Sequence, residues 1–317
     1  MEQLLPESTV SRLWADSIPL KKFLVFHNQR SIPLAMDEGG FAVDRAEMDF
    51  ELVKHAQSLG VEFLSPAKAK LMDCQHDLRA VEIIIEGESR TLNAKVIVMA
   101  CGLGNRAAGV FEEFQQTPAP NSRLGVEAVF DTFPAQYKSG ELCMAIGNHG
   151  YVGLTHIGNH RLHVAAAIDR STLQQLGAHA AVEKLMLQSG APALTQTDVT
   201  WRGTPPLTAG SPSIADDRVF VIGDAAGYVE PFTGEGIRWA LENGMGVAPF
   251  VASAVSQWHP QIATDYRLWY QRTISSRQKL CRHLARGLKR SSLRWAAHQA
   301  LRFRPSLATS IIKRLNS

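Results

Sequence analysis

Short apolar or alternating runs recur along the chain, each bounded by glycine, proline or polar residues, and this pattern predicts strands. The runs lie at residues 22–27, 32–36, 61–64, 68–72, 80–85, 90–92, 95–100, 124–130, 141–146, 151–157, 161–168 and 219–222. Two connections, Asn148-His149-Gly150 and Gly158-Asn159-His160, have the composition of hairpin turns. The stretch 124–168 is therefore predicted to form an antiparallel sheet.

Apolar positions with helical spacing predict helices between and after these runs. The segments are residues 6–16, 44–60, 171–189, 236–258, 261–290, 291–303 and 305–316. Gly177 is expected to break the third of them. In the second, Asp44 is placed to cap the helix and Gly60 to end it. The expected apolar stripe of this second helix consists of Met48, Leu52, Val53, Ala56 and Leu59.

Strands and helices are both predicted, and the fold class is predicted to be α/β, with a mixed sheet and helices. At 317 residues the chain can form one large or two ordinary domains. Its content of 45% hydrophobic and 20% charged residues is that of a globular protein. No apolar run reaches the ~20 residues that a membrane-spanning helix needs. Residues 1–10 lack the basic and apolar regions of a secretory signal, which favours a cytoplasmic location.

Cysteine and histidine give no sign of a metal site. The four cysteines are scattered and form no Cys-x-x-Cys pair, which suits a reducing compartment. They are Cys74, Cys101, Cys143 and Cys281. Four histidines lie between residues 149 and 163, but no cysteine or carboxylate accompanies them at ligand spacing. We therefore expect neither a bound metal nor a disulfide framework.

Residues 218–237, which read RVFVIGDAAGYVEPFTGEGI, carry the strongest chemical signal. The apolar run 219–222 is typical of a strand buried on both faces. Asp224 follows it, and the loop that leads to the next helix contains three glycines, Gly227, Gly234 and Gly236. A carboxylate after a buried strand can accept two sugar hydroxyls, and the free N–H groups of a helix start can bind a ligand. This order of features favours a ligand-binding loop.

The stretch GDAAGYVEPFTGEGIRWALENG resembles the second flavin-binding motif of a superfamily that comprises FAD-dependent aromatic hydroxylases, geranylgeranyl reductases and flavin halogenases. It is most similar to the geranylgeranyl reductase-like branch, whose motif has the form GDAAG-x-x-x-P-x-T-GEGI-x-x-A. The resemblance implies FAD as cofactor, bound by an FAD/NAD(P)-binding, Rossmann-like domain. In this stretch it implies cofactor contacts for Gly223, Asp224, Ala225, Gly227, Pro231, Gly234, Glu235 and Gly236.

Two further segments resemble landmarks of the same superfamily. Arg45 opens the helix before the Gly-Val-x-Phe segment at 60–63, where a polar residue hydrogen-bonds the flavin in the family. The alternative is a surface arginine at a helix N-terminus, where a cation is unfavourable. Residues 101–106 occupy the place of an Asp-Gly motif, with Gly102 and Arg106 retained and cysteine in the place of the aspartate. This departure weakens the case for NAD(P)H as electron donor more than the case for FAD.

The resemblance also implies a substrate domain, built as an antiparallel sheet and inserted into the flavin domain. It places residues 201–207 beside the substrate pocket, so Trp201 and Arg202 are candidates for substrate contact, with core packing as the alternative. Tyr151 is a third candidate. Flavin halogenases carry a Trp-x-Trp-x-Ile-Pro motif near this place, but residues 150–157 read GYVGLTHI, so halogenation is less favoured.

The predicted organisation is an FAD-binding domain from residues 1–120 and 214–260, a substrate domain from 121–213 and a basic helical tail from 261–317. A Rossmann-like flavin domain opens with Gly-x-Gly-x-x-Gly in its first β-α-β unit. No such motif is found, and the first six residues, MEQLLP, resemble a Gly-Glu-x-Leu-Leu-Pro segment that follows this unit in full-length relatives. The resemblance therefore implies that the first β-α-β unit is missing.

Charge is distributed unevenly along the chain. Residues 266–317 contain 13 Lys and Arg and no Asp or Glu, although the net charge of the whole chain is only +3. Three alternatives are open for this basic tail: a solvated face packed on the core, adsorption to an anionic membrane, or docking of an acidic carrier protein. No recognisable nucleic-acid-binding module accompanies the charge, so nucleic acid is not an expected partner.

These features predict an FAD-dependent oxidoreductase that acts on a hydrophobic small molecule, either free or bound to a carrier protein. The reaction is either a hydroxylation by a monooxygenase or the reduction of an isoprenoid-like double bond, and no residue is singled out as a catalytic acid or base. The alternative is a catalytically silent, truncated flavoprotein paralogue whose tail binds a membrane or a protein partner.

Overall fold

The computed structural model describes residues 4–15, 17–104, 106–158, 160–230, 232 and 234–289, and the single positions 292, 293, 296, 299 and 300. The chain divides into two compact units. The first comprises Met1–Phe63, Leu124–Gly203 and Gly287–Ser317, and the second comprises Leu64–Arg123 and Thr204–Arg286. Each unit is therefore assembled from segments that lie far apart in the sequence.

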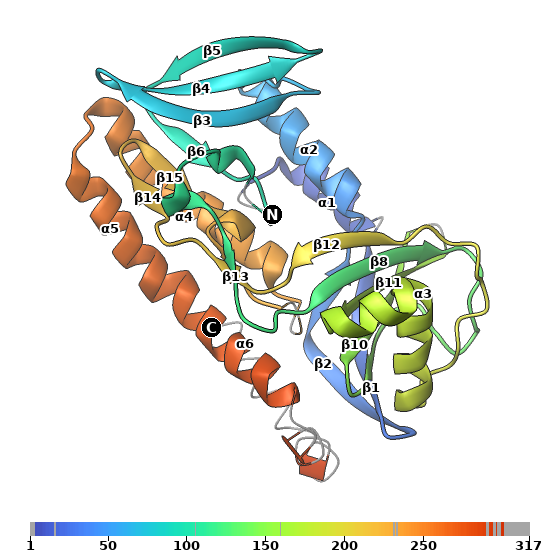
Figure 1. The fold of residues 1–317 in the computed structure, drawn as a ribbon. Coiled ribbons are helices and arrows are strands. Elements are labelled where there is room, and N and C mark those ends of the chain that lie inside the picture. Colours follow the sequence, from blue (N-terminus) through green and yellow to red (C-terminus); the bar gives the residue numbers. More distant parts are fainter. Residues whose placement is uncertain are drawn as a thin grey trace. The chain divides into compact units, whose positions relative to one another are not determined.

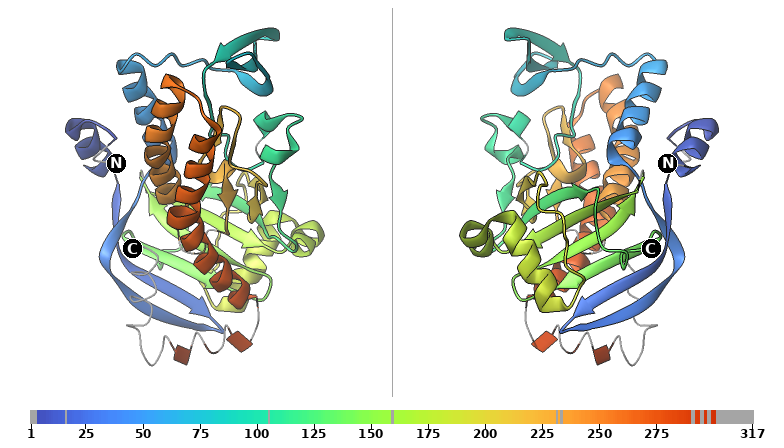
Figure 2. Two further views of the ribbon diagram at one scale, coloured as in Figure 1. Left: turned by 90° about the vertical axis from the view of Figure 1, so that its left-hand side faces the viewer. Right: turned by 90° about the vertical axis from the view of Figure 1, so that its right-hand side faces the viewer.

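A mixed sheet of seven strands, in the order β12-β8-β11-β10-β9-β1-β2, organises the first unit (Figure 1). The strands are β12 (Arg202–Pro206), β8 (Leu124–Phe130), β11 (Arg161–Ile168), β10 (Gly150–Ile157), β9 (Glu141–Ile146), β1 (Ile18–His27) and β2 (Arg30–Ala42). β8, β11, β10 and β9 pair antiparallel, which confirms the predicted sheet. β1 adds to β9 in parallel and carries β2 with it as a long hairpin (Figure 2).

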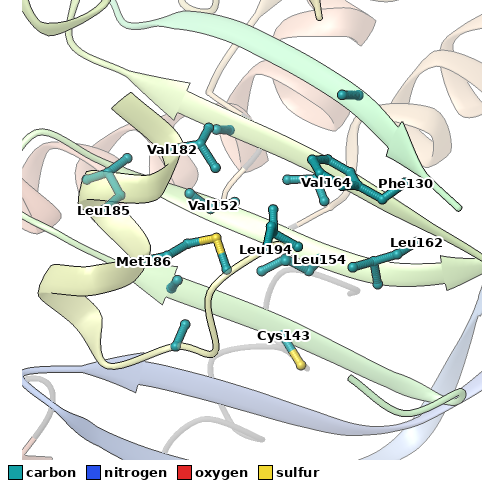
Figure 3. Packing of buried hydrophobic residues seen from close by; sticks show 14 of the residues in the cluster. Phe130, Cys143, Val152, Leu154, Leu162, Val164, Val182, Leu185, Met186 and Leu194 are labelled. Atoms are coloured by element: carbon teal, nitrogen blue, oxygen red, sulfur yellow. The ribbon is translucent and has the colours of Figure 1, made fainter. Parts of the chain in front are cut away.

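Helix α3 (Arg170–Ser189) packs on this sheet and closes the main hydrophobic core. Alternate strand residues contribute to the core, because successive side chains of a strand point to opposite faces. Figure 3 shows Val152, Leu154, Leu162 and Val164 of the strands together with Val182, Leu185 and Met186 of the helix. Gly177 has a φ of 74° and interrupts the helix, as predicted.

Helices α1 (Glu7–Ala15) and α2 (Arg45–Ser58) pack together in the first unit. The Asp44 carboxylate accepts a hydrogen bond from the Ala46 N–H at 3.0 Å, so its predicted capping role is confirmed. The predicted apolar stripe of α2 is wrong at its end, because Leu59 is 72% exposed. Glu51 is buried instead, since its carboxylate pairs with Arg12 of α1 at 2.6 Å.

Three small sheets form the strand part of the second unit. β3 (Lys68–Gln75), β4 (Leu78–Ile85) and β5 (Glu88–Ala94) make an antiparallel meander. β6 (Ile97–Met99), β15 (Val219–Val221) and β14 (Ala215–Asp216) make the second sheet, and β7 (Thr117–Pro118), β13 (Ala209–Gly210) and β16 (Gly227–Tyr228) make the third. Short 3-10 turns lie at Arg106–Ala108, Glu112–Phe114 and Gly223–Ala225.

The helices of the second unit pack on β15. α4 (Gly236–Ser256) and α5 (Pro260–Tyr270) share a core with it, in which the Phe220 ring meets the Tyr266 ring edge-on at 5.3 Å. A π-helical turn at Gln271–Ser275 continues α5 into α6 (Ser276–Leu288), so that the three form one rod (Figure 1). No helix within the described residues is long and apolar enough to cross a membrane.

Residues 61–64 do not form the predicted strand. A strand needs a neighbour for its backbone hydrogen bonds, and no strand of the described part of the chain lies beside this segment.

The boundaries of the two units differ from the predicted domain boundaries. Residues 1–63 group with 124–203, and residues 261–286 belong to the second unit instead of forming a separate tail. The division of flavin and substrate binding between domains stays a prediction. The helices predicted at 291–303 and 305–316 lie outside the described residues, apart from the five single positions named above.

Candidate functional site

β6 and β15 are adjacent parallel strands, so the loops that follow them leave the sheet at the same edge. Their pairing runs from Val219 beside Ile97 to Val221 beside Met99. The N–H of Ile222 then donates to the Met99 carbonyl at 2.9 Å. In open α/β sheets, ligands bind outside the carboxyl ends of such strands. Loops 100–106 and 222–236, which we call the β6 loop and the β15 loop, therefore form the candidate site.

Gly223 turns the chain sharply at the end of β15. Its φ of 58° lies in the left-handed region that favours glycine. Its N–H donates to Asn243 Oδ1 of α4 at 2.8 Å, so the turn is tied to the helix that follows the loop. The turn leaves Asp224 half-buried at the carboxyl end of the strand, the position at which a carboxylate can meet a ligand.

Buried polar side chains hold the backbone of the β15 loop. Tyr266 Oη donates to the Val221 carbonyl at 2.8 Å and accepts from Asn243 Nδ2 at 2.9 Å. Gln278 Nε2 donates to the Gly227 carbonyl at 3.0 Å. Tyr266 and Gln278 come from α5 and α6, so helices expected to form a basic tail support the candidate site. Their only signal in the sequence is that they are polar residues placed on the inner face of amphipathic helices.

Two more side chains of the second unit, Gln116 and Ser211, reach the β15 loop. Gln116 donates to the carbonyls of Asp224 and Ala225, and Ser211 Oγ also donates to the Ala225 carbonyl, at 3.1 Å. Neither residue belongs to a motif, so sequence reasoning missed both. A contact between residues 108 positions apart leaves no local pattern.

Two of the predicted glycines border open space. A Cβ added to Gly102 or to Gly234 would meet no described atom within 4 Å beyond its chain neighbours. Both have a positive φ, 70° and 75°. No described residue fills the space beside these backbones, so a ligand can approach them closely. Together with Asp224, this arrangement fits a flavin cofactor.

Glu235 places a carboxyl directly before α4. Its side chain is 15% exposed, and Oε2 is buried without a hydrogen bond from any described residue. Arg238 Nη1 lies 3.8 Å from this oxygen, while Arg238 Nε donates to Glu242 at 2.9 Å. Burial raises the pKa of Glu235, although the nearby Arg238 acts in the opposite direction. The carboxyl therefore keeps a proton at a pH at which an ordinary glutamate has lost it.

A buried ion pair anchors the start of the Pro231–Gly236 segment. Arg123 Nη1 donates to Glu230 Oε1 at 2.7 Å, and both side chains are only 2% exposed. Removing one partner of such a pair leaves an uncompensated buried charge, so the contact holds Glu230 strongly in place. Pro231 lies outside the described residues, and its predicted cofactor contact stays a prediction.

Solved structures match the chain over most of its length, whereas no family model matches it. The flavin-dependent brominase Bmp2 is 14% identical with a TM-score of 0.74, over 95% of this chain and 77% of that chain. A geranylgeranyl bacteriochlorophyll reductase-like protein from Thermoplasma acidophilum is 17% identical with a TM-score of 0.69, over 86% and 72%. The probable FAD-dependent monooxygenase PqsL from Pseudomonas aeruginosa is 17% identical with a TM-score of 0.65, over 90% and 83%.

The chain has the fold of flavin-dependent halogenases and monooxygenases. This confirms the predicted fold class, and the fold is the one that the resemblance of residues 223–236 implies. Within this flavoprotein fold, the predicted glycines and Asp224 all fall in the β6 and β15 loops of the second unit. Arg106 begins a 3-10 turn in the first of these loops, and its side chain lies outside the described residues.

Cys101, which the resemblance puts in the place of an aspartate, lies in the β6 loop. Desolvation raises the pKa of its thiol. Because the thiolate and not the thiol is the nucleophile, this shift agrees with its interpretation as a plain small residue.

The other predicted site residues belong to the first unit. Arg45 pairs with Asp49 at 3.0 Å, and this pair offsets the unfavourable placement of a cation at the start of α2. Trp201 packs edge-on against Phe130 at 6.0 Å and borders the core under α3, as the packing alternative predicts. Tyr151 is buried in β10, and Arg202 is exposed in β12. The cofactor and substrate contacts predicted for these residues stay predictions.

The histidines of the first unit have other partners. His156 Nε2 bonds with the Tyr137 carbonyl at 2.9 Å, and His163 lies 3.3 Å from the Glu127 carboxylate. No group of three or more metal-ligating side chains is found among the residues that the structure describes.

Proposed function

We propose that this chain binds FAD and is an FAD-dependent oxidoreductase that acts on a hydrophobic small molecule. The observation that supports this most directly is the pair of loops at the carboxyl ends of β6 and β15, in which Gly102 and Gly234 border open space and Asp224 follows a buried strand. Proteins of the same fold are described as flavin-dependent and FAD-dependent enzymes.

Each part of the site has a distinct role in this proposal. Asp224 accepts hydroxyls of the ribityl chain, and the glycines of the β15 loop allow the backbone to approach the cofactor. The N–H groups and the positive dipole end of α4, which begins at Gly236, favour negative charge on the reduced cofactor. FAD supplies the redox chemistry when bound, while the residues of the chain bind it, orient it and exclude water.

The reaction remains a choice between two classes in this proposal, hydroxylation and reduction of an isoprenoid-like double bond. Both kinds of protein occur among the similar structures, as a probable monooxygenase and a reductase-like protein. The substrate is a hydrophobic molecule, free or carrier-bound. NAD(P)H is the less favoured electron donor, because Cys101 replaces the expected aspartate. To test this point, the oxidation of NADH and of NADPH by the FAD-loaded protein is followed. Chemical reduction of the same FAD-loaded protein serves as the reference.

The proposal is tested by titrating the purified full chain with FAD and following the cofactor's absorbance and fluorescence. We expect one FAD per chain, and we expect Asp224→Ala to weaken binding by roughly ten- to a hundredfold, the loss for hydrogen bonds to a charged group. Asp216→Ala, at the other end of the same hairpin, is the matched control and should bind normally. A wild-type protein that takes up no added FAD would overturn the proposal.

A second candidate function, peripheral binding to an anionic membrane, is favoured by α6. Its inner face carries Gln278, Cys281 and Ala285, and the outer face of the rod exposes basic side chains. These are Arg272, Lys279, His283 and Arg286. This function is compatible with a silent flavoprotein as well as with an active one.

A further inference from the structure

Gln116 bonds to both loops of the candidate site at once. It lies between the 3-10 turn Glu112–Phe114 and β7. Its Oε1 accepts a hydrogen bond from the Gly104 N–H at 2.6 Å, in the β6 loop. Its Nε2 donates to the carbonyls of Asp224 at 2.5 Å and Ala225 at 3.1 Å, in the β15 loop. One side-chain amide therefore spans the two loops.

Only an amide of this length can make this set of contacts. The β6 loop offers an N–H donor and the β15 loop offers carbonyl acceptors, so the bridging group must accept on one side and donate on the other. Glutamate would keep the acceptor but would place a negative charge beside two carbonyl oxygens. Methionine would fill a similar volume and lose both contacts.

The backbone of Gln116 is itself held in place by the third sheet of the second unit. Thr117 and Pro118 of β7 pair with β13, and β13 pairs on its other side with Gly227 and Tyr228 of β16. Ser211, directly after β13, also donates to the carbonyls of Phe114 and Ala225. Gln116 thus directly precedes the sheet in which the GDAAG segment, residues 223–227, ends. Its backbone is held by that sheet, so its side chain can act as a rigid spacer.

We propose that Gln116 is a positioning residue that sets the separation of the β6 and β15 loops and so prepares both for one cofactor. The cofactor part of this inference rests on the proposed FAD binding. The structural part does not, because all three hydrogen bonds lie within the protein. Glycine turns leave both loops with few side chains of their own to fix their separation. Gly102 and Gly234 have positive φ, and a Cβ on either would meet no described atom within 4 Å beyond its chain neighbours.

The first test measures hydrogen exchange of backbone amides in the protein without cofactor. Gln116→Met should speed exchange at Gly104, whose N–H loses its acceptor, and also at Gly223 and Ala226 in the β15 loop. Gln116→Glu should affect the β15 loop more than Gly104, because it keeps the acceptor. The matched control is Gln115→Met, since the Gln115 side chain donates to the Gly109 carbonyl at 2.7 Å, outside both loops. Exchange that changes in one loop alone with Gln116→Met, or equally in the control, would overturn the inference.

The second test adds FAD to the same variants. Gln116→Met should weaken FAD binding by about tenfold or more, shift the visible circular dichroism of the bound cofactor and leave the stoichiometry unchanged, while Gln115→Met should match the wild type. Altered exchange with wild-type affinity and spectrum would overturn the positioning role. If the wild-type chain binds no FAD, the proposed function fails, and the exchange experiment alone decides whether Gln116 couples the loops.

Discussion

At the scale of single residues, Glu235 makes the stability of the protein depend on pH. Burial raises the pKa of its carboxyl in the folded chain, whereas in the unfolded chain it returns to about 4.3. Between these two values the folded state binds the proton and the unfolded state has lost it. The contribution of Glu235 to the free energy of unfolding is therefore largest at low pH, and it is lost as the pH rises through the raised pKa.

Glu235→Gln tests this linkage, because the amide keeps the shape and does not titrate. The free energy of unfolding of the wild type, relative to that of the variant, should fall as the pH rises above about 4.3. Urea unfolding followed at several pH values gives this difference directly. Glu88→Gln, on the exposed strand β5, controls for the change in net charge. A difference that does not change with pH would contradict the assignment.

At the scale of elements, α4 carries two glycines with opposite roles. A Cβ on Gly244 would meet nothing within 4 Å, so this glycine only lowers the helix propensity. A Cβ on Gly246 would come within 2.1 Å of the Trp269 ring on α5. Of these two glycines, Gly246 is therefore the one that permits close packing against α5. The close approach of α4 and α5 matters for the site, because Asn243 and Tyr266 bond between these helices.

The two glycines provide a matched pair of substitutions. Gly244→Ala should stabilise the protein by about 1 kcal/mol through helix propensity. Gly246→Ala should destabilise it by about 1–3 kcal/mol, because the added methyl group overpacks against an aromatic ring. Chemical denaturation measures both changes. Equal effects of the two substitutions would show that α4 and α5 do not pack as described.

At the scale of the whole molecule, the proposed binding to anionic lipid depends on the exposed basic residues of the rod that α5 and α6 form. Binding to vesicles that contain phosphatidylserine should exceed binding to phosphatidylcholine vesicles and should weaken with added salt. The double variant Lys279→Glu/Arg286→Glu should lower it by at least about tenfold, since each basic residue near the surface contributes about 1 kcal/mol. Flotation with vesicles is the measurement.

The control for this experiment reverses two charges elsewhere. Lys68→Glu/Arg90→Glu changes the exposed surface of β3 and β5 by the same charge. Equal loss of binding in both double variants would mean that only the net charge of the chain matters. If the wild-type chain does not bind anionic vesicles at all, the membrane proposal fails, and an acidic protein is the partner to seek.

Local signals account for what the sequence predicted correctly. The bounds of the strands at 124–130, 141–146 and 161–168, the Asp44 cap, the break at Gly177 and the strand-loop-helix order at 219–236 were predicted correctly. Each depends on neighbours within a few residues, where propensity and turn chemistry act. The failures are Leu59, predicted to be buried, and residues 61–64, predicted to form a strand. In both cases the local pattern was apolar. Burial and strand pairing also require a second segment of the chain, and the local pattern does not show which segment that is.

The sequence by itself determined the α/β class, most element positions and the fold, and it singled out the loop that is predicted to bind a cofactor, because these follow from periodicity and from one long motif. Only the tertiary structure decided that β1 pairs in parallel with β9, that α5 and α6 belong to the second unit, and that Gln116, Tyr266 and Gln278 hold the β15 loop. These contacts join residues tens to more than a hundred positions apart. Hydrogen bonding and close packing between such residues depend on where the folded chain brings them, which no local pattern of residues specifies.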